Sequence, residues 1–396
     1  MRVSRRHANF PVRRARNLLH GRAGYRIETD WGRAGILEGG GHICEVILKV
    51  CGELNPLWTP PWKTIDPQEY SPSRHARLYG PRPDGRLLAG IAGHSLSFDH
   101  FGPPSKEEIA AGVSTHGEAP SVKWKLQPVR NALGPTLQAS TTLPEARLHF
   151  TRTISLDPRQ PVVYCEEQAG NLSAFDRAIS LTEHVTFGPP FVEPGITIFD
   201  MPATHGKVCP ASYSSRSIIK PNAEFEWPLA PAIKGGAFNL RTIPDRRFGN
   251  YTAQLLDPNA RIAFTSACNP RLRLLVVHAF RRADFPWVGR WLESFYRPQA
   301  PWRSRTLCCG MEFSSTPFPI PRRETVDQNR LFGEKTYRWL PAKSTITIRF
   351  IMLLFRVPGD FRGVRNVSVM GRAATVLEMG AHPRRLNSAV RSFLEV

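Results

Sequence analysis

The sequence lacks any long apolar run, and this absence excludes a membrane-spanning protein. A membrane span needs roughly 18 or more apolar residues, whereas the best candidate here is FIMLLF at 350–355, which lies inside an alternating strand pattern. No apolar segment follows the basic N-terminus, so a secretory signal is not indicated either. We expect a cytoplasmic protein without a membrane partner.

Cysteines at the paired spacing of a metal site are also absent. The seven cysteines are odd in number, and no C-x-x-C spacing occurs among them. This pattern favours reduced, mostly buried thiols over a zinc ribbon or a secreted disulfide framework.

Acidic residues are missing from the N-terminus. The chain has a formal net charge of +20, and its first 25 residues hold seven arginines and no acid, which leaves +13 for the rest. We expect residues 1–26 to be a disordered basic extension, residues 27–380 a single domain and residues 381–396 a C-terminal tail. A nucleic-acid or membrane-surface arm and a transit-like leader are the alternatives for the extension. Outside it, basic and aromatic residues are not interleaved as in nucleic-acid modules, so nucleic acid is not an expected partner.

Long helical patterns are rare, whereas strand patterns recur. The 36 prolines and 30 glycines punctuate the chain often, and proline lacks the N–H donor that a helix interior needs. One short helix is expected at 105–113, where Ser105 and Glu108 form a capping box. Many strands without a repeat predict an all-β protein, a large β-sandwich in one domain. The expected strands are 25–29, 42–50, 146–156, 162–171, 180–188, 261–267, 271–280, 344–357 and 364–370.

Proline and tryptophan concentrate between residues 55 and 104. Such a texture predicts an ordered but irregular excursion, of the kind that builds a binding site on a rigid scaffold. A lid over the core is the alternative role for Trp58 and Trp62.

Ionisable residues crowd the next stretch, where five of them fall within 25 positions: His94, Asp99, His100, His116 and Glu118. These residue types can ligate metals. Their spacing matches neither H-E-x-x-H nor a paired-cysteine motif, so no metal is expected. We interpret His94, Asp99 and His100 as supports of the loop that carries His116.

Two residues far from this cluster suit proton transfer better. In SLTEHVTFG (180–188), strand alternation places His184 between two threonines on one face, which suits a polyhydroxylated ligand. Glu312 stands between Met311 and Phe313, which alternation places on the opposite face. A histidine acid and a carboxylate base are what general acid–base catalysis requires, although a lone strand histidine can also be structural.

The order of these features, His-Gly at 116–117, L-T-x-H-x-x-F at 181–187 and a late glutamate at 312, resembles the aldose 1-epimerase (galactose mutarotase) family over about residues 27–357. The resemblance implies the galactose mutarotase-like fold, a large curved antiparallel β-sandwich with few short helices, whose concave face holds the sugar. It implies that Glu312 is the catalytic base, His184 the acid and His116 a sugar contact. The implied partner is a carbohydrate, a monosaccharide or a glycan end, and no cofactor is required.

The sequence departs from the family pattern around each motif. Glu118 follows the His-Gly pair where no carboxylate is needed, Glu183 replaces an asparagine, and Glu312 does not lie beside proline. Arginines around residues 77 and 86 are candidates for the substrate arginine of the family, and residue 245 for its substrate aspartate. The further candidate contacts are therefore Arg77, Arg86, Glu118, Asp245, and, as faces for the sugar ring or as core residues, Trp62 and Trp124.

These features favour an aldose 1-epimerase-like isomerase that interconverts sugar anomers. The altered motifs keep open a non-catalytic carbohydrate-binding protein on the same fold. The charge of +13 outside the extension keeps open a lyase or isomerase that acts on an acidic sugar.

Overall fold

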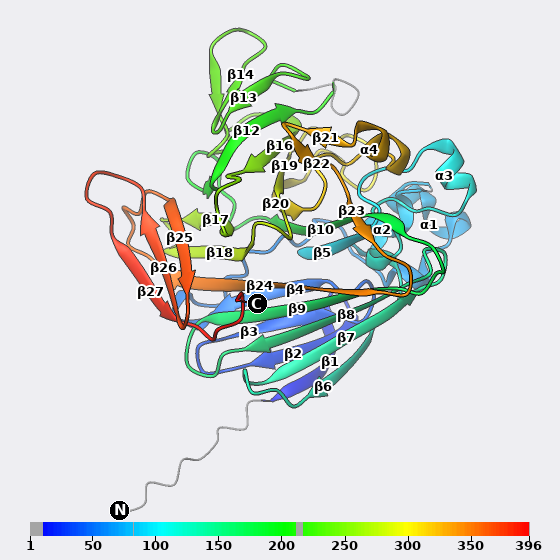
Figure 1. The fold of residues 1–396 in the computed structure, drawn as a ribbon, viewed down its shortest axis with the longest axis horizontal. Coiled ribbons are helices and arrows are strands. Elements are labelled where there is room, and N and C mark those ends of the chain that lie inside the picture. Colours follow the sequence, from blue (N-terminus) through cyan, green and yellow to red (C-terminus); the bar gives the residue numbers. More distant parts are fainter. Residues whose placement is uncertain (1–10, 82, 211–216, 396) are drawn as a thin grey trace, which may run out of the picture.

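Two large antiparallel sheets face each other across a hydrophobic core (Figure 1). The computed structural model describes residues 11–81, 83–210 and 217–395. Because alternating apolar positions of both sheets meet in this core, the predicted all-β antiparallel sandwich is confirmed. No helix in the described ranges is long and apolar enough to cross a membrane.

The larger sheet contains 12 strands. They are hydrogen-bonded in the order β1-β2-β3-β4-β5-β10-β20-β19-β16-β12-β13, and β23 pairs with β10. Their bounds are β1 (Val12–Leu19), β2 (Arg22–Glu28), β3 (Gly32–Leu37), β4 (Ile43–Leu48), β5 (His94–Asp99), β10 (Arg177–Phe187), β20 (Leu307–Ser314), β19 (Trp287–Ser294), β16 (Phe248–Leu256), β12 (Ala203–Val208), β13 (Glu224–Glu226) and β23 (Arg338–Leu340).

The second sheet contains eight strands in the order β11-β17-β18-β24-β9-β8-β7-β6. The alternating patterns predict β8, β9, β17, β18 and β24 of this sheet, and the bounds of β9 agree with the prediction. They do not predict β7, which is as long as β17 and β18. The strands are β11 (Ile198–Asp200), β17 (Ile262–Asn269), β18 (Leu274–Arg281), β24 (Thr345–Arg356), β9 (Val162–Asn171), β8 (Leu148–Leu156), β7 (Thr136–Leu143) and β6 (Lys125–Val129).

Smaller elements surround the sandwich. The remaining strands are β14 (Leu229–Pro231), β15 (Ala237–Asn239), β21 (Arg330–Leu331), β22 (Glu334–Lys335), β25 (Val364–Met370), β26 (Ala373–Glu378) and β27 (Arg385–Ala389). The helices are α1 (Pro72–Tyr79), α2 (Gly85–Gly90), α3 (Lys106–Ala110) and α4 (Arg322–Gln328), with single 3-10 turns η1 (Lys49–Cys51), η2 (Pro67–Glu69) and η3 (Ala119–Ser121). Helix α3 begins at the predicted capping box, in which the Glu108 N–H donates to Ser105 Oγ and the Ser105 N–H donates to the Glu108 carboxylate.

The C-terminal residues form a third layer instead of the predicted tail. Strands β25, β26 and β27 pair with one another (Figure 1), and Val367 and Val376 pack with Val277 on the outside of the eight-stranded sheet. The prediction for residues 381–396 is wrong because β27 completes this small sheet and Leu394 is buried in the same cluster.

The predicted N-terminal extension is wrong for residues 12–26. Strand β1 pairs with β2 at the edge of the larger sheet, and Leu18 is buried against Leu37 and Cys44. The arginines of β1 face solvent, where charge discourages edge-to-edge pairing with another chain. Arg2, Arg5 and Arg6 lie outside the described residues.

The segment 55–104 is only partly the predicted excursion. It contains α1 and α2, but residues 94–99 form β5, which pairs with β10 from Asp99 opposite Ser180 to His94 opposite Val185. Four of the six residues in HSLSFD are polar, yet all six are buried because both faces of β5 are covered.

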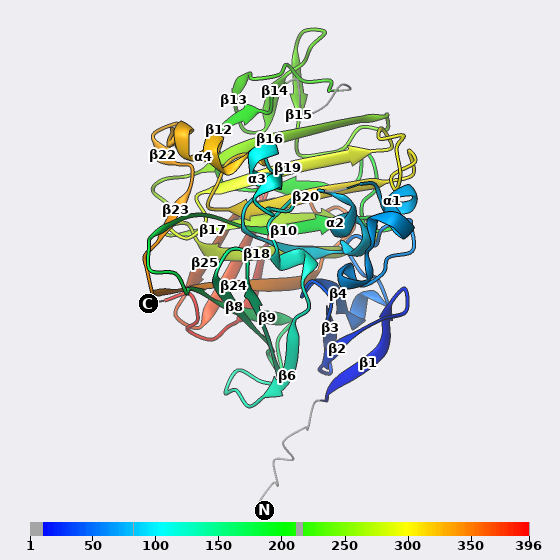
Figure 2. The same ribbon diagram turned by 90° about the vertical axis from the view of Figure 1, so that its right-hand side faces the viewer.

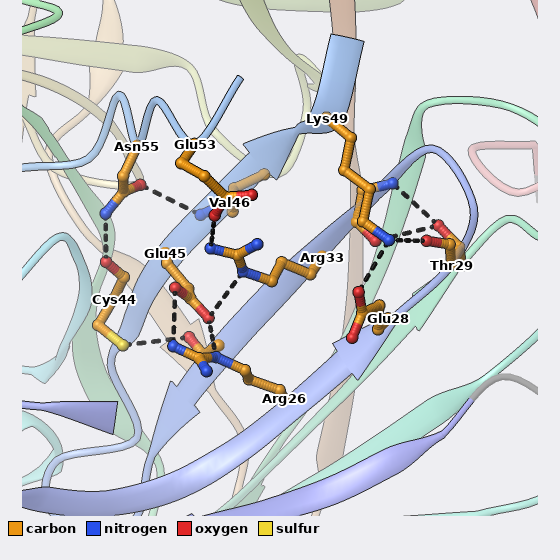
Figure 3. Close-up of polar contacts among 12 residues, drawn as sticks. Arg26, Glu28, Thr29, Arg33, Cys44, Glu45, Val46, Lys49, Glu53 and Asn55 are labelled. Atoms are coloured by element: carbon orange, nitrogen blue, oxygen red, sulfur yellow. Dashed lines mark hydrogen bonds and ion pairs between the residues drawn. The ribbon is translucent and has the colours of Figure 1, made fainter. Parts of the chain in front are cut away.

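A ladder of charges joins β2, β3, β4 and η1 (Figure 3). In the strands, the charged residues alternate with the core residues Ile27, Ala34 and Val46. Glu45 Oε1 lies 2.5 Å from Arg26 Nε and 3.6 Å from Arg33 Nε. Lys49 Nζ lies 2.8 Å from Glu28 Oε1. Each of these partly exposed charges therefore has an opposite partner.

Candidate active site

Strand β10 presents different side chains to its two faces. Leu181 and Val185 belong to the sandwich core, and Glu183 is buried on the same side. His184 lies on the opposite face, where its Nδ1 is 3.1 Å from Thr186 Oγ1. The side-chain alternation predicted from the sequence is present.

Glu312 lies beside His184 on the neighbouring strand β20. The register that sets Thr186 opposite Gly310 places Glu312 across from His184, and the adjacent Met311 belongs to the core. Burial of Glu312 on the polar face follows from this position, and its exposed fraction is 1%.

Two glycines leave room for the polar groups at this point of the sheet. A Cβ at Gly310 would lie 2.4 Å from Glu312 Oε1, and a Cβ at Gly289 would lie 1.9 Å from Tyr251 Oη. Gly289 pairs directly with Glu312 in the β19–β20 register. Larger residues at either position would displace the carboxyl or the phenol.

His116 reaches the same region from the loop that follows α3. Its φ is 62° and that of Gly117 is 75°, and a Cβ at Gly117 would lie 2.3 Å from the carbonyl oxygen of Phe98. The Gly102 N–H donates to His116 Nδ1 at 3.2 Å. The neutral imidazole therefore carries its proton on Nε2, which is the remaining donor of the ring.

His116, His184 and Glu312 line one cavity of about 860 Å³. The ring centroids of the two histidines are 5.2 Å apart, and His184 Nε2 lies 3.1 Å from Glu312 Oε1. That contact is off the direction of a hydrogen bond, and neither Glu312 oxygen has a hydrogen-bond partner among the described residues. Figure 2 faces the side where α1, α2 and α3 lie in front of β10, β19 and β20.

Burial controls the protonation of all three groups. It raises the pKa of Glu312 well above its ordinary value and lowers the pKa of His184 to about 4. Burial, with the nearby His184 and His100 adding to it, lowers the pKa of His116 well below its ordinary value. Between about pH 4 and the raised pKa of Glu312, the Glu312–His184 pair therefore holds one proton.

Three of the predicted substrate contacts do not line the cavity. Trp62 donates from Nε1 to the Leu88 carbonyl at 3.0 Å and packs edge-on against Trp302, so it supports the cavity wall. Arg86 is on α2, which supplies other lining residues. Arg77 is exposed on α1.

The structure places the other three predicted contacts elsewhere. Trp124 is a core residue, 1% exposed, whose Nε1 donates to the Ala119 carbonyl. A Glu118 oxygen accepts from the Ala146 N–H at 2.8 Å, which fixes the loop. Asp245 is exposed before β16 and does not line the cavity. The positions of these three residues correct the prediction that they contact substrate.

The sequence interpretation missed several residues of the cavity wall. Tyr251, Trp291, Arg297 and Trp302 line it, together with carboxylates at Asp84 and Glu324. A signal was present in FYRPQAPW (295–302), which has the same proline- and tryptophan-rich texture as residues 55–104 and lies just before β20.

The crowded ionisable residues at 94–118 do not form one cluster. His94 points into the core, while His116 lines the cavity. Asp99 does support the cavity rim, because its carboxylate lies 2.7 Å from Arg177 Nη2 and 2.9 Å from Arg322 Nη2 of α4. Within the described ranges, no three or more His, Cys, Asp or Glu side chains are placed to hold a metal ion.

A second buried cluster lies behind the cavity, on the core side of β10. Arg152 Nη2 lies 2.8 Å from Glu183 Oε2, and Arg152 Nε lies 2.6 Å from Glu167 Oε1. His94 Nε2 lies 2.6 Å from the same Glu183 oxygen. All four side chains are fully buried, so the loop-support role predicted for His94 is wrong.

Comparison with solved structures identifies the fold. The chain is similar to a proposed aldose 1-epimerase from Klebsiella pneumoniae, with a TM-score of 0.60, 14% identity, and coverage of 85% of this chain and 80% of that one. It is similar to a galactose mutarotase-like protein from Clostridium acetobutylicum, with a TM-score of 0.56, 12% identity, and coverage of 88% and 99%. A proposed aldose 1-epimerase from Escherichia coli gives a TM-score of 0.53, 11% identity, and coverage of 84% and 99%.

The sequence itself matches no protein-family model. It also matches no curated protein. At these low identities the structural similarity establishes the fold alone, which is galactose mutarotase-like, as the resemblance in the motifs predicts.

Proposed function

We propose that the protein interconverts the α and β anomers of an aldose by general acid–base catalysis. The observation that carries this proposal is the convergence of His116, His184 and Glu312, distant in sequence, on one buried cavity. The similar structures described as aldose 1-epimerases or mutarotase-like proteins support the same class of reaction.

The reaction requires one proton to be removed and one to be delivered. Glu312 takes the proton of the hydroxyl on C1, the C1–O5 bond breaks as the C1=O bond forms, and His184 protonates the ring oxygen. After rotation about C1–C2, the O5 hydroxyl attacks the other carbonyl face, returning its proton to His184 while O1 takes the proton from Glu312. Each such group contributes about 10²–10⁴-fold to the rate.

The geometry of the pair suits this exchange. Raised and lowered pKa values leave the single proton on Glu312. His184 Nε2 lies 3.1 Å from Glu312 Oε1, so a rotation of the carboxyl that aligns the two groups passes the proton to His184. This transfer produces the carboxylate base and the imidazolium acid together. His116 donates from Nε2 to a sugar oxygen and stabilises developing negative charge. No cofactor takes part.

The resulting pH dependence has two limbs. We expect kcat/KM to fall below about pH 4, where His184 takes up a second proton and the pair lacks a base. It should also fall above the raised pKa of Glu312, where the pair has lost its proton. Anomer exchange measured from pH 3.5 to 10 checks both limbs.

Substitution of the base tests the assignment directly. Glu312→Gln should reduce anomer exchange of glucose and galactose, followed by exchange NMR, by about 10²–10⁴-fold while calorimetry still detects sugar binding. Asp245→Asn, at an exposed carboxylate outside the cavity, is the matched control and should keep wild-type rates. Unchanged exchange in Glu312→Gln would refute the role of Glu312.

The wild-type protein separates catalysis from binding alone. If it binds sugars but never exceeds the spontaneous rate of anomer exchange, the protein is a non-catalytic carbohydrate-binding member of the fold. Exchange above the spontaneous rate supports the enzyme.

A further inference from the structure

Arg297 is a cavity residue that the proposed acid–base chemistry does not use. It lies in the loop between β19 and β20, and it lines the same cavity as His184 and Glu312. Its side chain is 21% exposed, so the guanidinium lies at the cavity wall and not in bulk solvent.

Contacts on several sides hold the Arg297 guanidinium in place. Its central carbon lies 4.8 Å from the ring centroid of Trp302 and 5.5 Å from that of Tyr296. Its Nε donates to Tyr296 Oη at 3.1 Å and lies 3.2 Å from Glu293 Oε2. The Glu293 carboxylate also accepts from the Arg297 main-chain N–H. A positive charge fixed in this way loses little conformational entropy when it binds a ligand.

The position of Arg297 relative to the proton-transfer pair defines a two-ended site. The Trp291 ring is close to both, with its centroid 5.7 Å from the His184 ring and 5.8 Å from the Arg297 guanidinium carbon. The place where C1 reacts and the positive charge therefore border the same indole of the cavity wall. A pyranose with an exocyclic anionic group can contact two groups that border one ring.

Other charges of the wall are placed differently. Asp84 Oδ1 accepts from Thr115 Oγ1 at 2.5 Å, and both Asp84 and Glu324 belong to exposed positions on the rim. Burial raises the pKa of Glu312, which favours its neutral form. Arg297 is the cationic side chain among the described residues that line the cavity.

Resting on the proposed function, we infer that Arg297 selects aldoses that carry an anionic group away from the anomeric carbon. A planar guanidinium forms paired hydrogen bonds with a carboxylate or a phosphate, the two groups that provide this chemistry on sugars. The anion contacts Arg297 beside Trp291 while C1 lies against Glu312 and His184.

The test compares sugars that differ in the distal group. Anomer exchange of glucose, glucuronate and glucose 6-phosphate is measured with wild-type protein by exchange NMR. At least one anionic sugar should have a kcat/KM about 10–100-fold above that of glucose, the value of a charge-assisted contact. A larger kcat/KM for glucuronate identifies a carboxylate as the preferred anionic group, and a larger kcat/KM for glucose 6-phosphate identifies a phosphate. Equal values for all three sugars, with exchange present, overturn the inference and leave the proposed function standing.

Two variants locate the preference. Arg297→Gln should reduce the ratio of anionic to neutral kcat/KM to about one, and Arg297→Lys, which keeps the charge but not the planar fork, should give an intermediate ratio. A ratio that is unchanged in Arg297→Gln overturns the inference. If that variant fails to fold, the kcat/KM values of the wild-type protein for the three sugars decide.

Failure of the proposed function gives a different result. If no sugar exchanges faster than spontaneously, calorimetric binding of the same three sugars replaces the rates. Preferential binding of an anionic sugar that Arg297→Gln removes then supports the role of Arg297 without catalysis. Equal binding of the three sugars overturns it.

Discussion

Strand β10 separates two clusters of buried ionisable residues, and the clusters differ in how their charges are met. On the core side, Arg152 lies between Glu167 and Glu183, and His94 contacts the same Glu183 carboxylate. Burial raises the pKa of both carboxyls, and the positive charge of Arg152 opposes this effect. Every member has a partner of complementary charge or hydrogen-bonding character, although one buried polar atom of each has no hydrogen-bond partner among the residues described.

On the cavity side, the groups are positioned but not satisfied. Neither oxygen of Glu312 has a hydrogen-bond partner among the residues described, although His184 lies 3.1 Å away. Glu183 and His184 are consecutive, so one peptide unit separates the salt-bridged core cluster from the Glu312–His184 pair. A buried carboxyl without a partner costs stability, which is the expected condition of a group kept for a ligand.

The core-side cluster predicts the largest effect on stability. Arg152→Met removes the shared cation and leaves Glu167 and Glu183 buried together, so the free energy of unfolding should fall by about 3–5 kcal/mol. Urea unfolding of the two proteins measures the difference.

A matched arginine provides the control for this prediction. Arg349 Nε lies 2.7 Å from Glu166 Oε2, but the two side chains are 36% and 29% exposed. Arg349→Met should therefore lower the free energy of unfolding by about 1 kcal/mol or less. An equal decrease in the free energy of unfolding in the two variants would show that the buried ion pairs of the core cluster stabilise the fold no more than an exposed one.

The cavity side predicts a smaller effect that depends on pH. The pKa of His184 is about 4 in the folded protein against an ordinary 6.5, because its ring is buried. As pH falls from 6.5 towards 4, the unfolded chain binds a proton that folded His184 does not, so stability decreases by about 3 kcal/mol. His184→Gln should remove this part of the decrease.

Other titrating groups determine how the measurement is made. Buried His42 and His116 also have lowered pKa values, and the raised pKa of Glu312 acts with the opposite sign above its unfolded value. These groups remain in both proteins, so the informative quantity is the difference between their slopes of unfolding free energy from pH 7 to 4.5. Parallel slopes would contradict the lowered pKa of His184.

The sequence predicted which side chains of β10 share a face, but not which residues of other strands they contact. Alternation in SLTEHVTFG assigns Glu183 and His184 to opposite faces, and this depends only on strand geometry. That Glu183 meets Arg152 depends on which strands face each other across the core. Such a pairing is a property of the topology and leaves no local pattern.

The candidate site shows the same division between what a local pattern predicts and what depends on the topology. His184, Glu312 and His116 were selected as candidates because their motifs resemble those of one family, and they line one cavity, whereas Arg297 lies in the loop between β19 and β20 and belongs to no such motif. Asp245 and Trp124 were misplaced because residue type alone does not distinguish a cavity contact from a surface or core residue.

The charged ladder around β2–β4 (Figure 3) includes an ion pair that is more exposed than either of the two clusters beside β10. Lys49 Nζ lies 2.8 Å from Glu28 Oε1, with side chains 35% and 42% exposed. Glu28→Gln should change the free energy of unfolding by about 0.5 kcal/mol or less, and this difference should shrink further in 1 M salt, because water and ions screen exposed charges. Urea unfolding at low and high salt measures it. A loss comparable to that of Arg152→Met would mean that proximity of charges, and not their burial, governs the energetics of this sheet.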